Sequence, residues 1–455
     1  MQATGDLTGG RVSDRLLCFY FPLLFSNTLQ QVYTFVDIII VAKGLGDQAL
    51  GAVGNLSSLI LFITGFLMGI TNGFSVNIAQ SFGAGNYNLL RKNIAHSIKL
   101  CCTITAALTL ISLISLEPLL ISMQTSSFLM RDSLLYGYVF FGGLCATAGY
   151  NLCACILRAL GDSRTPLKAI LISSVANIFF DCVMIFGFRT GVEGAALATV
   201  FSQAISAAVC CHKLRKNDLI RVQYEDFTKD HSVAQSLLHN GIPAACMNSV
   251  TAVGCIVVQG YVNALGAAFT SAYSACSKYL NLAMLPSLTA GFSLSAFVSQ
   301  NKGAGNVQRI CEGVWIGIEI AFVSWLVVGG MMIFIPNRLA GLILNGVDTI
   351  SLTAEFLRIC GSVLLLLNLL FVFRSTVQAM GYPLIPMFSG MLEMALRIPA
   401  VMLMMNRIGF RAAAYAESIA WLGALLLNAV AYIILIREGA AAYTLKYSTK
   451  PENEG

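Results

Sequence analysis

The stretch SVNIAQSFGAGN (Ser75–Asn86) is followed 220 residues later by a close copy, SAFVSQNKGAGN (Ser295–Asn306). The same offset pairs Leu45-Gly46 with Leu265-Gly266, and Ala159, Gly161 and Pro166 with Ala379, Gly381 and Pro386. One constant offset at three distant places indicates an internal repeat. The chain is therefore predicted to consist of two halves of the same design.

The composition predicts that both halves lie in a membrane. Of the 455 residues, 57% are hydrophobic and only 11% are charged, whereas an average soluble domain is about 25% charged. This excludes a disordered protein, a nucleic-acid-binding domain and an ordinary water-soluble enzyme. Apolar runs of about 20 residues match helices that cross roughly 30 Å of hydrocarbon, and the alternating segments of a membrane barrel do not dominate. We expect an all-α membrane protein.

Apolar windows predict twelve transmembrane helices in two six-helix lobes. They lie near residues 15–42, 50–75, 93–116, 133–158, 166–187 and 193–211, and near 239–263, 270–297, 312–335, 351–375, 384–405 and 412–436. The most polar stretch separates the two sets. We expect an N-terminal lobe over 1–217, a cytoplasmic linker over 218–235, a C-terminal lobe over 236–437 and a cytoplasmic tail over 438–455.

The distribution of basic residues predicts the orientation. Most Lys and Arg outside the predicted helices fall on the side that holds the N-terminus, and an excess of basic residues marks the cytoplasmic side. We therefore expect a multi-pass protein of the plasma (inner) membrane with both termini in the cytoplasm. Each half has an even number of helices, so both halves share one topology. They are expected to be related by an axis along the membrane normal, as in some secondary transporters.

Ionisable residues inside the predicted helices indicate a transport site. An Asp at a helix centre costs about 2.5–3.5 kcal/mol on insertion scales, so it requires a partner or a function. Asp37 and Asp181 both lie within apolar runs, and Asn177 precedes Asp181 by one helical turn on the same face. Thr199 adds a hydroxyl, and Tyr33 adds a phenol one turn before Asp37. These oxygen-bearing side chains are predicted to converge inside the first lobe.

The chemistry of such a cluster is that of cation binding. A buried carboxylate can be neutralised by a proton, or it can bind Na⁺ together with amide and hydroxyl oxygens. A small cation and a cationic drug would then compete for one charge, which is the principle of antiport. An alternative is that Asp37 and Asp181 only bond to buried backbone or cap a broken helix.

Other polar residues inside the predicted helices have weaker interpretations. Glu393 and Arg397 are four residues apart and are expected to form an ion pair that braces the second lobe. Under the repeat, Arg397 takes the position of Asn177, which argues against a cation site there. Glu417 is expected to be a solvated or capping group near a helix end. Lys278 either faces a central cavity, or snorkels or pairs locally. Candidates for polar groups of a substrate cavity are Gln30, Gln31, Tyr33, Asn151 and Lys278.

The repeated stretches resemble the multidrug and toxic compound extrusion (MATE) family. The resemblance covers nearly the whole chain. The matching stretches are Gln30–Gly54, Gly73–Asn86 and Leu157–Pro166 in the first half, and Ala264–Ala275, Ser299–Asn306 and Val377–Pro386 in the second.

This resemblance implies an efflux pump that exchanges organic compounds for inward H⁺ or Na⁺ by alternating access between two lobes. It also implies that the cation-coupling residues are Asp37, Asn177, Asp181 and Thr199, and that Tyr33 is a site residue. Some branches carry acidic residues on helices 7 and 10, but the predicted helices over 239–263 and 351–375 have no carboxylate in their cores. A second-lobe sodium site is therefore in doubt.

Other function classes remain as alternatives. A lipid-linked precursor flippase of the same superfamily would share the lobes and carry a large amphiphile. An intramembrane enzyme would need a metal-binding or nucleophile motif, and the sequence contains none. A channel fits paired lobes and buried carboxylates less well than alternating access does. We expect no cofactor other than the coupling ion, no nucleic-acid partner and a monomer in the bilayer.

Overall fold

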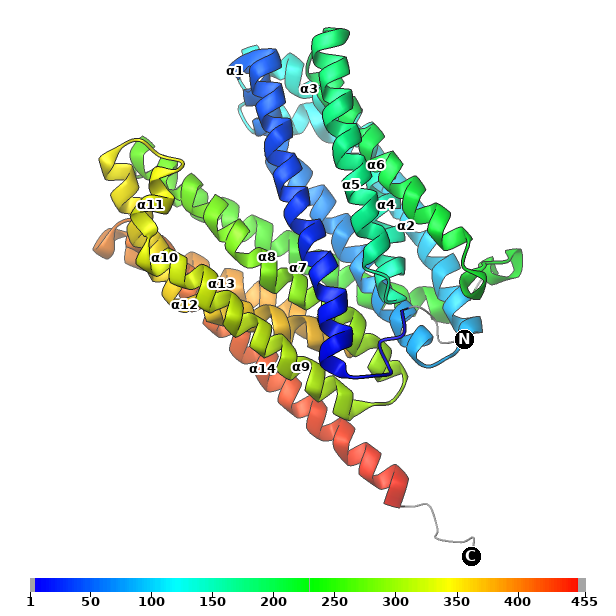
Figure 1. Cartoon of the computed structure of the whole chain (residues 1–455). Helices are drawn as coiled ribbons and strands as arrows, with labels where there is room; N and C mark the ends of the chain where they lie inside the picture. Colours follow the sequence, from blue (N-terminus) through cyan, green and yellow to red (C-terminus); the bar gives the residue numbers. More distant parts are fainter. Residues whose placement is uncertain (1–4, 229, 449–455) are drawn as a thin grey trace, which may run out of the picture. The chain divides into compact units, whose positions relative to one another are not determined.

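The computed structural model describes residues 5–228 and 230–448, with side chains except at 47, 218, 251–253, 255–256, 267 and 439–448. The described chain consists of helices and their connections, with no β-strand in these ranges (Figure 1). The predicted all-α membrane fold is confirmed.

The first half contains six long helical crossings and two short turns. Its helices are α1 Val12–Gly83, α2 Tyr87–Ser122, α3 Ser127–Gly142, α4 Leu144–Ala159, α5 Arg164–Asp181, the π-helical continuation η1 Cys182–Gly187, α6 Val192–Arg215, and the 3₁₀ turns η2 Asp218–Ile220 and η3 Tyr224–Phe227.

The second half repeats this order. Its helices are α7 His231–Asn263, α8 Ala267–Gly303, α9 Val307–Ser324, the π-helical segment η4 Trp325–Gly329, α10 Gly330–Phe334, α11 Pro336–Gly341, α12 Val347–Ala379, α13 Leu384–Ile408 and α14 Arg411–Ser448.

Twelve crossings follow from these elements. In the described residues, ten helices are individually long and apolar enough to span a membrane, and α3 with α4, bent by 44°, make an eleventh. The 33-residue α7 accounts for the twelfth. Two of the ten come from α1, which breaks at Gly46 into Val12–Gly46 and Gln48–Gly83. Helices of 33–38 residues are about 50–57 Å long, so they extend beyond roughly 30 Å of hydrocarbon or are tilted.

The backbone shows the repeat directly. The three glycine pairs at the 220-residue offset all have positive φ: +82° and +114° at Gly46 and Gly266, +67° and +73° at Gly85 and Gly305, and +82° at both Gly161 and Gly381. The GAGN turns also end alike. Oδ1 of Asn86 accepts from the Leu89 N–H (3.1 Å), and Oδ1 of Asn306 accepts from the Arg309 N–H (3.2 Å). Each Asn caps the helix that follows it.

The chain forms two compact units whose limits differ from the expected lobes. The first comprises residues 1–6 and 17–249, and the second residues 7–16 and 250–455. The division into transport lobes at 217 and 236 stays a prediction. It differs from the compact units because the starts of α1 and α7 pack with residues of the other sequence half.

Residues 7–16 belong to the second unit because they form hydrogen bonds around its GAGN turn, Gly303–Asn306, which we call the second GAGN corner. The Leu7 N–H donates to Oε1 of Gln300 (3.0 Å), and the Arg309 guanidinium donates to the carbonyls of Leu7 (3.1 Å) and Gly10 (2.7 Å). Val12 and Leu16 are buried.

The start of α7 is held in the first unit. Asp230 accepts from the Ser232 hydroxyl (2.7 Å) and pairs with Nζ of Lys92 on α2 (3.1 Å). The Ser232 hydrogen bond and the Lys92 ammonium lower the pKa of Asp230 to about 2, so this exposed carboxylate is ionised at neutral pH. Farther along α7, a side chain at Gly73 would meet Asn240 and Gly241, so α1 and α7 approach closely there.

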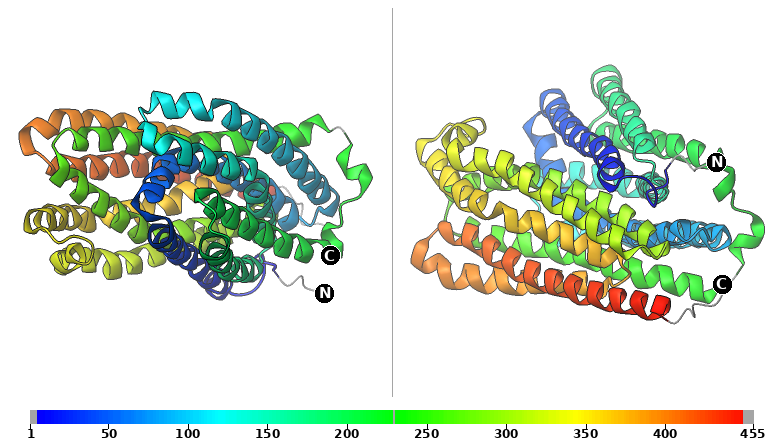
Figure 2. Two further views of the ribbon diagram at one scale, coloured as in Figure 1. Left: turned by 90° about the horizontal axis from the view of Figure 1, so that it is seen from above. Right: turned by 60° about the horizontal axis from the view of Figure 1, so that its bottom comes forward.

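A four-residue ion network lies buried in the second unit, where α12, α13 and α14 pack together (Figure 2). Nη2 of Arg374 lies 2.8 Å from Oε2 of Glu393. Nη2 of Arg397 lies 2.7 Å from Oε1 of Glu393 and 2.9 Å from Oε2 of Glu417. All four side chains are less than 10% exposed. Two positive and two negative charges therefore balance inside the helix bundle.

This network corrects one prediction and extends another. Glu417 is not a solvated or capping group. It lies almost two turns inside α14, which begins at Arg411, and it faces Arg397. Arg374 also belongs to the network, since it lies on α12, which continues to Ala379, and is buried.

The turn at Gly46 generates a stability prediction. Its φ of +82° and ψ of 180° lie in a region open essentially to glycine alone. We expect Gly46→Ala to cost about 1–3 kcal/mol and to lower the thermal unfolding temperature of the purified protein. Gly54→Ala is the matched control, because that helical glycine also has open space around its Cβ and has no positive φ. Equal unfolding temperatures for the two variants would contradict this account.

The ion network generates a second stability prediction. Glu393→Gln leaves two buried guanidinium groups facing one carboxylate, so we expect a loss of about 3–5 kcal/mol. The control is Glu355→Gln, which breaks the pair between Glu355 and Arg411, with side chains 37% and 58% exposed. Loss of that solvent-exposed pair should change the free energy of unfolding little. Thermal unfolding monitored by tryptophan fluorescence measures both. A loss at Glu355 as large as at Glu393 would refute the assigned role of burial.

Candidate functional site

The predicted site residues of the first unit come from three helices. Asp37 lies on α1, nine residues before its break at Gly46. Asn177 and Asp181 are four residues apart at the end of α5, and their side chains are buried, with 1% and 0% exposed. Thr199 lies on α6 and donates to the carbonyl of Ala195 (3.1 Å). The α-helical repeat places Asn177 and Asp181 on one face of α5.

The structure brings the two carboxyl groups together. Asp37 and Asp181 lie within hydrogen-bonding reach of each other, although they come from helices far apart in sequence. Oδ1 of Asp37, both carboxyl oxygens of Asp181 and Oδ1 of Asn177 are buried, and none has a donor among the described residues. Backbone bonding or helix capping, the alternative interpretation, therefore does not account for these oxygens. Buried acceptors without donors are costly unless a proton or cation is added.

Tyr136 on α3 also belongs to the site, although the sequence analysis missed it. Its phenol is within hydrogen-bonding reach of Thr199 and interacts electrostatically with Asp37 and Asp181. The side chain is 6% exposed. Its only signal in the sequence is a phenol in the middle of an apolar run, and Tyr is common in such runs.

The other predicted residues of the first unit lie at different distances from the carboxyl pair. Tyr33 contacts Gln30 and interacts with Asp37, which places both beside the site. Gln203 on α6 contacts Tyr33 and therefore also lies beside the site, although it was not predicted from the sequence. Gln31 and Asn151 are half-buried on α1 and α4, and no described contact connects them with the carboxyl groups.

Lys278 lies exposed on α8 of the second unit. Its role in a substrate cavity stays a prediction.

The arrangement is suited to binding one small cation. Of the ion pairs formed by the described residues, none includes Asp37 or Asp181. The cluster supplies carboxylate, amide, hydroxyl and phenol oxygens, which are ligands for a hard cation or acceptors for a proton. Among the described residues of the first unit, no cationic side chain therefore pairs with either carboxyl group.

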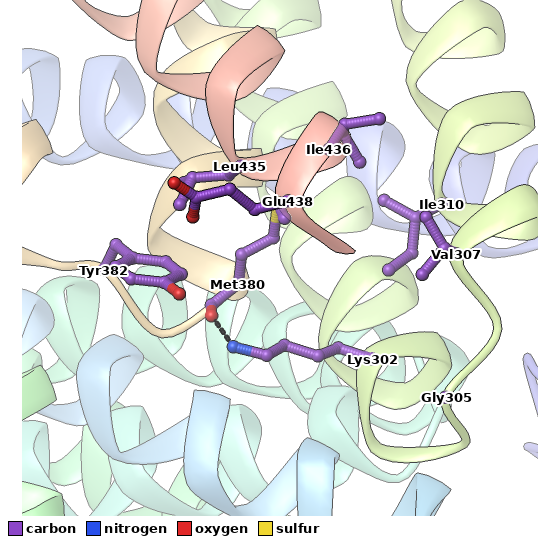
Figure 3. Close-up of a pocket in the computed structure, with 9 residues that line it drawn as sticks. All are labelled: Lys302, Gly305, Val307, Ile310, Met380, Tyr382, Leu435, Ile436 and Glu438. Atoms are coloured by element: carbon purple, nitrogen blue, oxygen red, sulfur yellow. Dashed lines mark hydrogen bonds between the residues drawn. The ribbon is translucent and has the colours of Figure 1, made fainter. Parts of the chain in front are cut away.

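A separate cavity of about 290 Å³ lies in the second unit, next to the second GAGN turn (Figure 3). Nζ of Lys302 hydrogen-bonds the carbonyl of Met380 and lies 5.2 Å from the centre of the Tyr382 ring. None of the predicted site residues lines this cavity.

Comparison with known proteins identifies the family. The family model described as MatE matches residues 22–183 and 243–403, which together make up most of the chain. The chain is 28% identical to the protein named "Probable multidrug resistance protein YpnP" of Bacillus subtilis, over 67% of this chain and 68% of that protein. It is 23% identical to the multidrug export protein MepA of Staphylococcus aureus, over 90% and 92%. It is also 25% identical to an FAD transporter of Shewanella oneidensis, over 73% and 74%.

Solved structures show the same fold. An outward-facing multidrug resistance MATE family transporter of the MOP superfamily superposes with a TM-score of 0.90 at 20% identity, covering 97% of this chain and 99% of that one. A MATE crystallised in complex with MaL6 gives a TM-score of 0.90 at 19% identity, over 96% and 98%. The two matched segments of the family model and the repeat of six helices agree with these folds. The chain therefore belongs to the multidrug and toxic compound extrusion family of membrane efflux transporters.

Proposed function

We propose that this transporter is a secondary antiporter that exports organic, often cationic, compounds in exchange for inward H⁺ or Na⁺. One observation carries the proposal: Asp37 and Asp181 lie together, and Oδ1 of Asp37 and both carboxyl oxygens of Asp181 are buried with no described donor to satisfy them. Such a pair is stable in the bilayer only with a bound cation. Binding and release of that cation are then coupled to a change of conformation.

The coupling follows from charge competition. With a proton or Na⁺ bound, the cluster is close to neutral and no longer attracts a cationic drug. Without the ion, two carboxyl groups face each other and are stabilised by an organic cation or by a return to the ion-bound state. Tyr136 and Thr199 hold the oxygen lining in place through their mutual contact. We propose that α1, which carries Asp37 and Pro22, changes shape in this step.

The transported compounds are proposed from chemistry and from relatives. A negatively charged cluster favours organic cations, and MepA and YpnP are named for multidrug export or resistance. The FAD transporter shows that a relative of similar identity is named for an anionic nucleotide. Efflux of a fluorescent organic cation, of FAD and of a lipid-linked precursor, measured side by side, separates the antiporter from these alternatives. We further propose a monomer in the plasma (inner) membrane, with both termini in the cytoplasm as the basic residues indicate.

The first functional prediction concerns Asp37. We expect Asp37→Asn to reduce the uptake of a fluorescent organic cation into inverted vesicles, which measures export from the cytoplasmic face, to background, whether a pH or a sodium gradient drives it, because the variant cannot carry the exchanged charge. Asp14→Asn is the control. Asp14 is an exposed carboxylate on the same helix, and this variant should keep normal efflux.

Expression and insertion are checked by size-exclusion chromatography of the purified variants. Normal efflux by well-inserted Asp37→Asn protein would end the proposal. Gradient-independent efflux by the unaltered chain would exclude antiport.

The second functional prediction uses Thr199. A proton binds a carboxylate alone, whereas Na⁺ needs several oxygen ligands. We expect Thr199→Val to raise the sodium concentration for half-maximal sodium-driven efflux about tenfold, a change equivalent to about 1.4 kcal/mol, and to leave pH-driven efflux within about twofold. Thr103→Val is the control, since Thr103 also donates to a carbonyl four residues earlier but is exposed on α2. Equal loss with both gradients would argue against Thr199 as a ligand.

A further inference from the structure

The α5 and α13 helices have the same register in the repeat. They begin at Arg164 and Leu384, which are 220 residues apart. The preceding glycines, Gly161 and Gly381, have the same φ of +82°. Positions on the two helices can therefore be compared one by one.

This comparison places Arg397 where the first unit has Asn177. Both side chains are buried, with 2% and 1% exposed. Val401 takes the position of Asp181, and Glu393 takes that of Ser173. At the level of the candidate cation site, α13 thus carries a guanidinium in place of an amide and an apolar side chain in place of a carboxyl group, and its acidic residue lies two turns earlier than Asp181 does on α5.

The neighbouring helix has changed in a complementary way. Gly254 on α7 is the repeat partner of Thr34 on α1, and a Cβ built there would lie only 3.2 Å from Nη1 of Arg397. The guanidinium therefore lies against the α7 backbone, in space that a side chain would fill. Val257 stands where α1 has Asp37.

The charges of the two units differ in one respect. In the first unit the carboxyl pair has no ion-pair partner among the described residues. In the second, the guanidinium of Arg397 lies between Glu393 and Glu417, at 2.7 Å and 2.9 Å, and Arg374 completes the balance. The carboxyl pair of the first unit thus has no described cationic partner, whereas the two carboxylates of the second unit have covalently attached ones.

We infer that Arg397 is a tethered cation that occupies, in the second unit, the place of the exchangeable coupling ion. It limits the transporter to one exchangeable cation site and so determines the ratio of ions to substrate. The inference rests on the proposed function of the Asp37 site. Removal of the Arg397 charge leaves Arg374 with two carboxylates, a buried excess of one negative charge, and this excess should recruit H⁺ or Na⁺.

The experiment counts bound cations on the full-length purified chain. Bound ²²Na⁺ is measured at fixed pH, and proton uptake is measured in sodium-free buffer after a pH jump. Asp37→Asn provides a background without the first site. This variant is then combined either with Arg397→Asn, which introduces the residue found at this position in the first unit, or with Arg397→Lys, which keeps the positive charge. A further variant combines Arg397→Asn with Glu417→Gln and restores neutrality without a cation.

Relative to Asp37→Asn alone, we expect one additional bound Na⁺ or proton per molecule with Arg397→Asn, and no additional cation with either control. A folded Asp37→Asn, Arg397→Asn protein that binds neither ion overturns the inference. An equal gain with Arg397→Lys also overturns it. So does an Arg397→Asn chain that misfolds in every sodium-containing or acidic buffer while its Glu417→Gln derivative folds.

Failure of the proposed function gives a different result. If Asp37→Asn alone retains all cation binding of the unaltered chain, Asp37 is not the coupling residue. The comparison of Arg397→Asn with Arg397→Lys in the unaltered chain then still decides the inference: one additional cation supports it, and no additional cation overturns it.

Discussion

The structure depends on one constraint: a charge placed inside hydrocarbon must have an opposite charge or a proton beside it. The second unit meets this constraint with its own side chains, through Arg374, Glu393, Arg397 and Glu417. The first unit leaves it unmet at Asp37 and Asp181. The network of the second unit is complete by itself, whereas the carboxyl pair of the first unit can be completed only by a group from outside the described chain.

Duplication followed by divergence explains this difference. The turns and caps of the two halves have kept the same backbone conformations, as Gly161 and Gly381 show, because helix packing depends on them. Side chains within the helices have diverged, since a buried position tolerates any group whose charge is balanced. One half could therefore keep a carboxyl pair without an internal cation while the other acquired guanidinium partners for its carboxylates.

Hydropathy and the repeat predicted most of the fold, because long apolar runs allow little besides helices in a bilayer. The helix ends were placed too early: α8 and α14 continue into polar sequence, where intrahelical hydrogen bonds persist without apolar burial. The clustering of Asp37 with Asp181 was anticipated, since each is expensive alone. The depth of Glu417 and the burial of Arg374 were not, because the rotation of α14 and α12 about their axes leaves little trace in a strongly apolar sequence. Tyr136 was missed for a similar reason: only tertiary packing directs its hydroxyl to Thr199.

The contacts of Leu7 and Gly10 with the second GAGN corner bear on biosynthesis. Gln300 is synthesised 293 positions after Leu7. At bacterial or eukaryotic synthesis rates this separation corresponds to roughly 15–60 s. The contact between Leu7 and the second GAGN corner can therefore form only after the chain has been extended through Gln300. Completion of the second unit is a late event in which a segment made early joins a corner made long after it.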